Sequence, residues 1–270
     1  MFGRIHFISG LPRAGSTLLA ALLRQNPRFQ ASMSGPLAGL FGSLLTEMSA
    51  RSEFSVFITD VQRQRMLRGL FEQYYADEPA EVVFDTHRSW CARLPALATL
   101  FPESKVIACV RQVSWIVDSL ERRIRQNALQ PSSIFNYTTS GTVYTRANGI
   151  AGPEGMVGYA YDALKEAFYG EHADRLLLVQ YETLVSDPAK ALAAIYDFLG
   201  ETAFRHDTEH VHYDATAFDT KAGTPGLHEV RPKVEAQERP TILPPDLFRR
   251  FENDAFWCNP KLNTRGVRIV

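Results

Sequence analysis

Several features of common protein classes are missing from this sequence. It has only three cysteines in 270 residues, Cys91, Cys109 and Cys258. No two of them form a Cys-x-x-Cys pair, which excludes a disulfide framework and a cysteine zinc site and predicts three buried thiols in a reducing compartment. No apolar run approaches the roughly 18 residues of a membrane span, and an apolar strand is expected by Ile5. We therefore expect a cytoplasmic protein with no signal peptide or membrane anchor ahead of the fold.

An excess of charge of either sign is also missing. The formal net charge is −1, and charged residues make up 22% of the chain. This balance argues against general binding to nucleic acid or to anionic membranes, but leaves room for a local basic cleft. Internal repeats, low-complexity tracts and a recognisable linker are lacking as well. We expect residues 1–270 to form a single α/β domain.

What the chain does have is an alternation of apolar and amphipathic segments. Strands are expected at 5–9, 81–85, 105–110 and 175–181, and helices at 16–25, 36–50, 60–76, 113–124, 154–170 and 188–198. Residues 130–155 are rich in Ser, Thr, Asn and Gly and predict a loop, while 205–245 has no clear assignment. The alternation predicts an α/β fold in three layers, with a central parallel sheet covered by helices on both faces.

The stretch Gly10-Leu-Pro-Arg-Ala-Gly15-Ser16-Thr17 lies between the first strand and the first helix. Its spacing is that of a phosphate-binding loop, G-x-x-x-x-G-K-[ST], except that Ser16 stands in the place of the lysine. The amides of such a loop and the helix N-terminus bind a tetrahedral anion. The lysine and Mg²⁺ are needed for a highly charged γ-phosphoryl group. A sulfuryl group carries less charge, so a metal-free loop with Arg13 as its one cation can suffice.

The same loop carries a resemblance to a known family. "GLPRAGSTLL" resembles the 5′-phosphosulfate loop of sulfotransferases that use 3′-phosphoadenosine 5′-phosphosulfate (PAPS), which reads roughly P-[KR]-[SA]-G-[ST]-T. The resemblance implies a P-loop NTPase-like fold, PAPS as the donor, 3′,5′-ADP as the product and no metal. The residues that it implies for donor binding in the loop are Arg13, Ala14, Gly15, Ser16, Thr17 and Leu18. Arginine at position 13 is similar to the Golgi and bacterial branches, and we expect a bacterial member.

A second match is "KVIACVRQVSWIVDS". The family binds the 3′-phosphate with an arginine just after a strand and a serine eight residues later, which implies these roles for Arg111 and Ser119. Arg111 leaves the carboxyl end of a strand, where open α/β sheets bind ligands. Ser119 is expected about two turns into the next helix, turned back toward the same anion.

A third match is "EVVFDTHRSW", which resembles the strand that ends in Lys-Thr-His in many sulfotransferases. The resemblance implies that His87 deprotonates the acceptor, a task that suits a side chain with a pKa near ~6.5. Asp85 replaces the lysine of the family pattern, and we expect it to point the same way as His87. Related branches use a glutamate after the first helix, which is absent here; Glu47 and Asp60 are the fallback carboxylates. The other histidines are predicted to be structural, with His228 in "TPGLHEV" the least certain.

Two weaker matches follow. Tyr181 in "LLLVQYETLVSDP" matches a family tyrosine that lies close to the adenine, or else is part of the core. "GLHEVRPKV" resembles a late basic loop that closes over the 3′-phosphate, which implies roles for Arg231 and Lys233. The alternative for these two residues is solvated surface.

Together these features predict a sulfotransferase that moves the sulfuryl group of PAPS to a hydroxyl or amine on a small molecule, peptide or carbohydrate. The acceptor is expected between segments 33–60 and 130–155, where Phe41, Phe135, Tyr137 and Tyr144 are candidate lining residues. A homodimer is one expected state. Two alternatives stay open. One is a P-loop-type kinase, which Ser16 disfavours although Asp85 is a candidate Mg²⁺ ligand; the other is a non-catalytic 3′,5′-ADP-binding module.

Overall fold

A computed structural model describes residues 3–129 and 141–270 of the chain. Its centre is a six-stranded sheet in the order β2-β3-β1-β4-β5-β6, and every neighbouring pair of strands is parallel. The strands are β1 (Arg4–Gly10), β2 (Phe29–Ala31), β3 (Val82–Thr86), β4 (Val106–Val110), β5 (Leu176–Gln180) and β6 (Arg268–Ile269). The predicted parallel sheet is confirmed.

Helices connect the strands and cover the sheet. They are α1 (Ser16–Leu23), α2 (Leu37–Glu47), α3 (Asp60–Tyr74), α4 (Leu94–Leu100), α5 (Val113–Gln126), α6 (Val143–Ala151), α7 (Met156–Tyr169), α8 (Tyr181–Ser186), α9 (Pro188–Leu199), α10 (Thr216–Lys221) and α11 (Pro245–Arg250). A short 3-10 helix, Arg88–Arg93, follows β3. No helix within 3–129 or 141–270 is long and apolar enough to cross a membrane.

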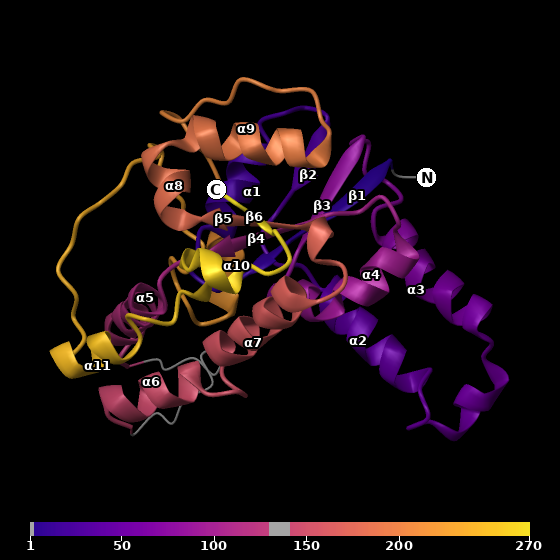
Figure 1. Cartoon of the computed structure of the whole chain (residues 1–270), viewed down its shortest axis with the longest axis horizontal. Helices are drawn as coiled ribbons and strands as arrows, with labels where there is room; N and C mark the ends of the chain where they lie inside the picture. Colours follow the sequence, from indigo (N-terminus) through magenta and orange to yellow (C-terminus); the bar gives the residue numbers. More distant parts are fainter. Residues whose placement is uncertain (1–2, 130–140) are drawn as a thin grey trace.

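Aromatic side chains from alternate positions of the strands fill the two faces of the sheet. On one face, Phe7 of β1 packs at 5.9 Å from Phe71 of α3 and 5.2 Å from Trp90, measured between ring centres. On the other face, Phe29 of β2 lies 5.3 Å from Phe84 of β3 and 5.4 Å from Tyr196 of α9. Figure 1 shows α1, α8 and α9 on one side of the sheet and α4 and α7 on the other. The three-layer arrangement is thus confirmed, while the single-domain organisation stays a prediction.

The predicted loop over 130–155 is wrong for its second half. Residues Val143–Ala151 form α6, which begins after Thr142, whose side chain accepts a hydrogen bond from the backbone N–H of Thr145. Ala147 and Ile150 are buried against the core, so packing outweighs the polar composition of the segment. The candidate acceptor residues Phe135 and Tyr137 lie outside the described residues.

The prediction of three buried thiols is also wrong at one position. Cys91 and Cys109 are buried, but Cys258 is exposed. Cys258 ends a short 3-10 helix in which Phe256 and Trp257 take the buried positions, and the larger apolar surface of these two rings decides which side chains face the core.

Because the strands are parallel, their carboxyl ends meet at one edge of the sheet. Four segments leave this edge: the glycine loop after β1, the Arg88–Arg93 helix after β3, α5 after β4 and α8 after β5. The sequence-predicted site residues follow these same strands. The fold therefore gathers them where open α/β sheets bind ligands.

Candidate active site

A pocket of about 670 Å³ lies at the carboxyl edge of the sheet. The glycine loop, the end of β3, one side of α5, Tyr181 and the late segment 227–239 line it. Of the sequence-predicted residues, the lining includes His87, Arg13, Gly15, Ser16, Thr17, Leu18, Arg111, Ser119, Tyr181, Arg231 and Lys233. Ala14 is fully buried in the core, so only its backbone amide is available to a ligand.

The loop owes its shape to two glycines in the left-handed region. At Gly10, with φ of 98°, a Cβ atom would lie 2.2 Å from the carbonyl oxygen of Cys109, so a larger residue would push β1 away from β4. Gly15, with φ of 94°, precedes the first turn of α1. The N–H groups of that turn have no intrahelical partners and, with the helix dipole, favour an anion.

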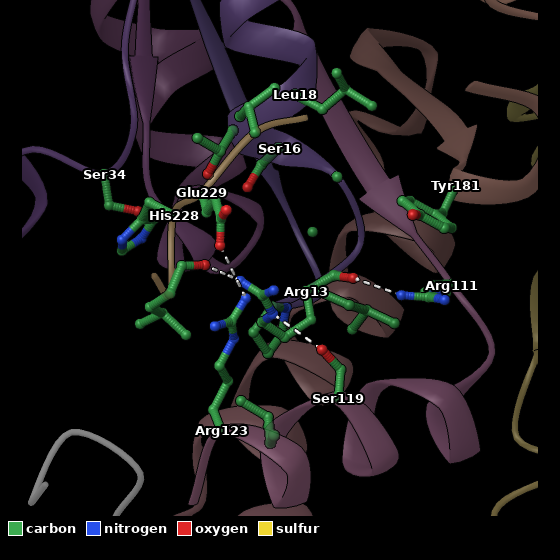
Figure 2. A pocket seen from close by; sticks show the side chains of 18 of the residues that line it. Arg13, Ser16, Leu18, Ser34, Arg111, Ser119, Arg123, Tyr181, His228 and Glu229 are labelled. Atoms are coloured by element: carbon green, nitrogen blue, oxygen red, sulfur yellow. Dashed lines mark hydrogen bonds and ion pairs between the residues drawn. The ribbon is translucent and has the colours of Figure 1, made fainter. Parts of the chain in front are cut away.

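Arg13 joins the two predicted anion sites. Its backbone is also left-handed, with φ of 60°, and its Nε donates a hydrogen bond to Ser119 Oγ at 3.2 Å. A second guanidinium nitrogen donates to the carbonyl oxygen of Leu227. Figure 2 shows these two bonds on either side of the guanidinium. The sequence assigned Arg13 to the sulfuryl group and Ser119 to the 3′-phosphate, so their direct contact was not anticipated.

Burial, together with the neighbouring cations Arg123 and Arg111, lowers the pKa of Arg13 to about 10. The guanidinium is still charged at neutral pH. Three arginines close together repel one another unless an anion lies between them. The pocket is therefore built for a ligand of strongly negative charge.

Arg111 lies beside Arg13, and not all of its guanidinium N–H donors have a hydrogen-bond partner among the described residues. Its guanidinium carbon is 4.0 Å from the ring centre of Tyr181, and one terminal nitrogen donates to the Arg13 carbonyl oxygen at 3.4 Å. Arg111 Nε is buried without a hydrogen-bond partner among the described residues. Burial also lowers the pKa of Arg111. A buried donor without a partner is costly, and a phosphate oxygen would satisfy it.

His87 stands at the end of β3, where its backbone N–H donates to the carbonyl oxygen of Ile8 at 3.0 Å. Its Nδ1 is 2.7 Å from Ser89 Oγ and accepts the backbone N–H of Ser89 at 3.2 Å. Burial, together with the adjacent Arg88, lowers the pKa of His87 to about 4. The imidazole is therefore neutral across the physiological range.

Asp85 does not point into the pocket beside His87, which corrects the expectation from strand alternation. Its side chain is 1% exposed and accepts hydrogen bonds from Tyr75 Oη and Trp90 Nε1, each at 2.7 Å. Burial raises the pKa of this carboxyl, although both hydrogen bonds oppose the rise. Asp85 ties α3 and the Arg88–Arg93 helix to β3, and this position does not suit an Mg²⁺ ligand.

Several residues of the pocket were missed by sequence reasoning or given a structural role. Arg88 lines it next to His87, and Arg123 lines it from α5. His228 lines it from the late segment and is paired with Asp219. The sequence stretch "GLHEV" had pointed to the segment that contains His228. Asp219, the acidic partner of His228, lies nine residues earlier in the chain and belongs to no recognisable motif.

Other expectations fit less well. Phe41 is fully buried, packed 5.8 Å from Trp90 between ring centres, so it cannot line an acceptor site. Tyr144 is exposed and donates to Asp246 at 3.1 Å. Lys233 lines the pocket but pairs with Glu209 at 2.9 Å on the surface. Ser34 is the residue from segment 33–60 that faces the pocket.

Metal-binding side chains do not cluster in the described part of the chain: no group of three or more His, Cys, Asp or Glu residues is arranged to hold an ion. The charges that face the pocket are mostly guanidinium groups. What the arrangement can do is bind a multiply charged anion through amides and arginines.

Comparison with models of known protein families identifies one family for this chain. Residues 6–205 match the sequence model described as "Sulfotransferase family". No curated protein matches the sequence. Among solved structures, the chain is similar to the sulfotransferase domain from the Synechococcus PCC 7002 olefin synthase, with 21% identity over 94% of this chain and 96% of that one and a TM-score of 0.49.

Two further solved structures are similar to the chain. The sulfotransferase domain from the curacin biosynthetic pathway has 19% identity over 76% of each chain and a TM-score of 0.49. Mouse sulfotransferase SULT7A1 complexed with PAP has 15% identity over 98% of this chain and 80% of that one, also with a TM-score of 0.49.

Proposed function

Since the chain belongs to the sulfotransferase family, we propose that it takes the sulfuryl group from PAPS and transfers it to a hydroxyl or amine acceptor in this pocket. The observation that carries the donor assignment is the cluster of Arg13, Arg111 and Ser119 at the mouth of the glycine loop. It offers an anion the buried Arg111 Nε, which has no hydrogen-bond partner in the described part of the chain. PAPS supplies two anionic groups, a 3′-phosphate and a 5′-phosphosulfate, on one small molecule.

Each part of the pocket suits a part of the donor. The amides of residues 14–18 and the N-terminus of α1 would hold the 5′-phosphosulfate. Arg111 and Ser119 would hold the 3′-phosphate, with Arg13 within reach of both groups through its bond to Ser119. Tyr181, which stacks on Arg111, would lie near the adenine. Arg231 and Lys233 would close the late segment over the nucleotide.

Transfer needs charge stabilisation where the donor breaks. The bridging oxygen gains negative charge as 3′,5′-ADP departs, and the loop amides, the helix dipole and Arg13 are fixed donors for that charge. No metal is required in this scheme. A histidine of the pocket takes the acceptor proton, and His87 is the residue that the sequence pattern assigns to this role. A cytoplasmic location and a homodimeric state are part of the same proposal.

Labelled sulfuryl transfer tests the function. PAPS carrying ³⁵S is incubated with the protein, EDTA and a panel of alcohols, phenols and amines; we expect labelled acceptor and 3′,5′-ADP. Arg13→Ala should lower turnover more than 3′,5′-ADP affinity, because the charge that Arg13 faces grows in the transition state. Binding of 3′,5′-ADP without transfer to any acceptor would favour the non-catalytic module. Mg²⁺-dependent phosphoryl transfer from ATP would favour the kinase.

A further inference from the structure

The pocket holds a second histidine whose surroundings differ from those of His87. His228 Nδ1 lies 2.6 Å from Asp219 Oδ1, and the His228 backbone N–H donates to Asp219 Oδ2 at 2.8 Å. The two side chains are 16% and 3% exposed. His228 Nε2 has no hydrogen-bond partner in the part of the chain that the structure describes, and His228 lines the pocket.

The segment that carries His228 is hydrogen-bonded to the anion-binding loop. Leu227, the residue before His228, accepts a hydrogen bond from the Arg13 guanidinium, so the backbone at His228 is fixed relative to the loop. Figure 2 shows His228 and Glu229 on the chain segment that faces Arg13. The imidazole is therefore held near the site where the 5′-phosphosulfate would lie.

Hydrogen bonding assigns opposite tautomers to the two histidines. A backbone N–H can only donate, so the Ser89 N–H makes His87 Nδ1 an acceptor and leaves the proton of the neutral ring on Nε2. An ionised carboxylate can only accept, so Asp219 places the His228 proton on Nδ1 and leaves a lone pair on Nε2. His87 thus presents an N–H donor, and His228 presents a proton acceptor.

We propose that His228, oriented by Asp219, is the general base of the transfer, and that His87 remains a neutral hydrogen-bond donor beside it. The inference rests on the proposed function. The acceptor proton moves to His228 Nε2 while the acceptor oxygen bonds to sulfur. The bond between sulfur and the bridging oxygen breaks, and its electron pair leaves on 3′,5′-ADP. A carboxylate behind an imidazole stabilises the imidazolium that forms, and His87 has no carboxylate partner of this kind among the described residues.

Nuclear magnetic resonance of ¹⁵N-labelled histidine tests the tautomers without any substrate. In the neutral protein we expect His228 to carry its proton on Nδ1 and His87 to carry its proton on Nε2, with assignments from His228→Asn and His87→Asn. A His228 ring protonated on Nε2 would overturn the proposal, since that tautomer cannot accept a proton from the pocket.

A series of acceptors separates a base from a merely structural residue. An aliphatic alcohol needs its proton removed, whereas 4-nitrophenol is already largely ionised in mildly alkaline buffer. His228→Asn, which keeps a donor toward Asp219, should slow transfer to the alcohol by about 10²–10⁴-fold, with a far smaller loss for 4-nitrophenol. The matched variant His87→Asn should slow both acceptors by similar factors.

The opposite pattern, with the alcohol-selective loss in His87→Asn alone, would overturn the assignment. Unchanged 3′,5′-ADP affinity in both variants would show that the pocket is still folded. If the wild-type protein labels no acceptor at all, the proposed function fails, while the tautomer measurement still decides the state of His228.

Asp219 is a positioning residue in this proposal, and its signature is a shifted pH profile. The groups that face the pair are the Phe218 ring, 5.5 Å from the His228 ring centre, and the Arg13 cation and the Tyr213 hydroxyl, which both interact with Asp219. The neighbouring Glu229 is instead paired with Arg123 at 3.8 Å. Asp219→Asn removes the anion nearest the imidazole, so the acid limb of the rate profile should move to lower pH. A lower rate with an unmoved limb would assign Asp219 a structural role only.

Discussion

Arg88 is a cation of the pocket that the sequence pattern does not assign. The lysine of the Lys-Thr-His pattern is replaced by Asp85, which is turned into the core. Arg88 follows His87, is half-buried and lines the pocket. Burial lowers the pKa of its guanidinium, and no carboxylate within the described ranges pairs with it. A cation in this position is best satisfied by an anionic ligand.

Replacing Arg88 tests this role. Arg88→Met keeps much of the side-chain volume and removes the charge, so turnover should fall by roughly 10–100-fold, the effect of one charge-assisted hydrogen bond. The affinity for 3′,5′-ADP should change little, because that product lacks the sulfuryl group. Steady-state kinetics and calorimetry measure the two quantities. Equal losses in both would place Arg88 on the nucleotide instead.

Arg111 is predicted to read the 3′-phosphate. Arg111→Ala should weaken 3′,5′-ADP binding by roughly 1.5–3 kcal/mol, because the 3′-phosphate loses a charged hydrogen-bond donor. The loss should nearly vanish for 5′-AMP, which has no 3′-phosphate. Calorimetric titration of both nucleotides against both proteins gives the comparison, and an equal loss for the two ligands would contradict this role.

A buried carboxylate of α5 holds residues 239–242, which follow directly on the late segment, against that helix. Asp118 is fully buried on α5. It accepts hydrogen bonds from Thr241 Oγ1 at 2.8 Å and the Ile242 backbone N–H at 2.7 Å. Arg122 and Arg239 also donate to it. Burial favours a higher pKa for Asp118, but these hydrogen bonds outweigh it and hold the pKa below its ordinary value. Arg239 lines the pocket, so this attachment shapes the site.

Removing the carboxylate should be costly. Asp118→Ala leaves the Ile242 N–H and two half-buried arginines, Arg122 and Arg239, without this partner, and we expect a loss of about 1–3 kcal/mol in the free energy of unfolding. Asp118→Asn keeps part of the hydrogen bonding and should lose less. Urea titration measures both. A change below about 1 kcal/mol for the alanine variant would show that solvent replaces these contacts.

The elements that the sequence predicted are those with a repeating local pattern. Each of β3, β4 and β5 contains a run of consecutive apolar residues. β1 has apolar residues at Ile5, Phe7 and Ile8, and α5 has one apolar face. By contrast, β2 has three residues and β6 has two. These strands are too short to show a sequence pattern, and they form because β3 and β5 offer free edges.

Contacts between residues that are distant in the sequence limit the prediction of the site in the same way. Motifs located Arg13 and Ser119, but their contact joins residues 106 positions apart, and only the fold brings them together.

At the scale of the whole molecule, a buried histidine links stability to pH. His6 of β1 is 2% exposed, and its Nδ1 accepts the Lys105 N–H at 3.1 Å. Burial, with the nearby Arg4 and Lys105 cations, lowers the pKa of His6 to about 3. The unfolded chain binds this proton near pH ~6.5, so the folded state loses stability as the pH falls from there toward 3.

The expected slope for this one group is up to about 1.4 kcal/mol per pH unit. His6→Asn keeps an acceptor for the Lys105 N–H and removes the titration, so its unfolding free energy should fall less steeply between pH 6 and pH 4. Chemical unfolding at several pH values compares the two proteins. Identical slopes would mean that His6 is protonated with little cost in the folded state.

We expect this pocket to bind 3′,5′-ADP, the product of PAPS, through amides and arginines and without a metal. Calorimetric titration of 3′,5′-ADP in the presence of EDTA tests it most directly, with ATP as the comparator. We expect tight 3′,5′-ADP binding that the chelator does not change, and much weaker ATP binding, because Ser16 replaces the lysine that reaches the β- and γ-phosphates. Strict Mg²⁺ dependence, or a preference for ATP, would contradict it.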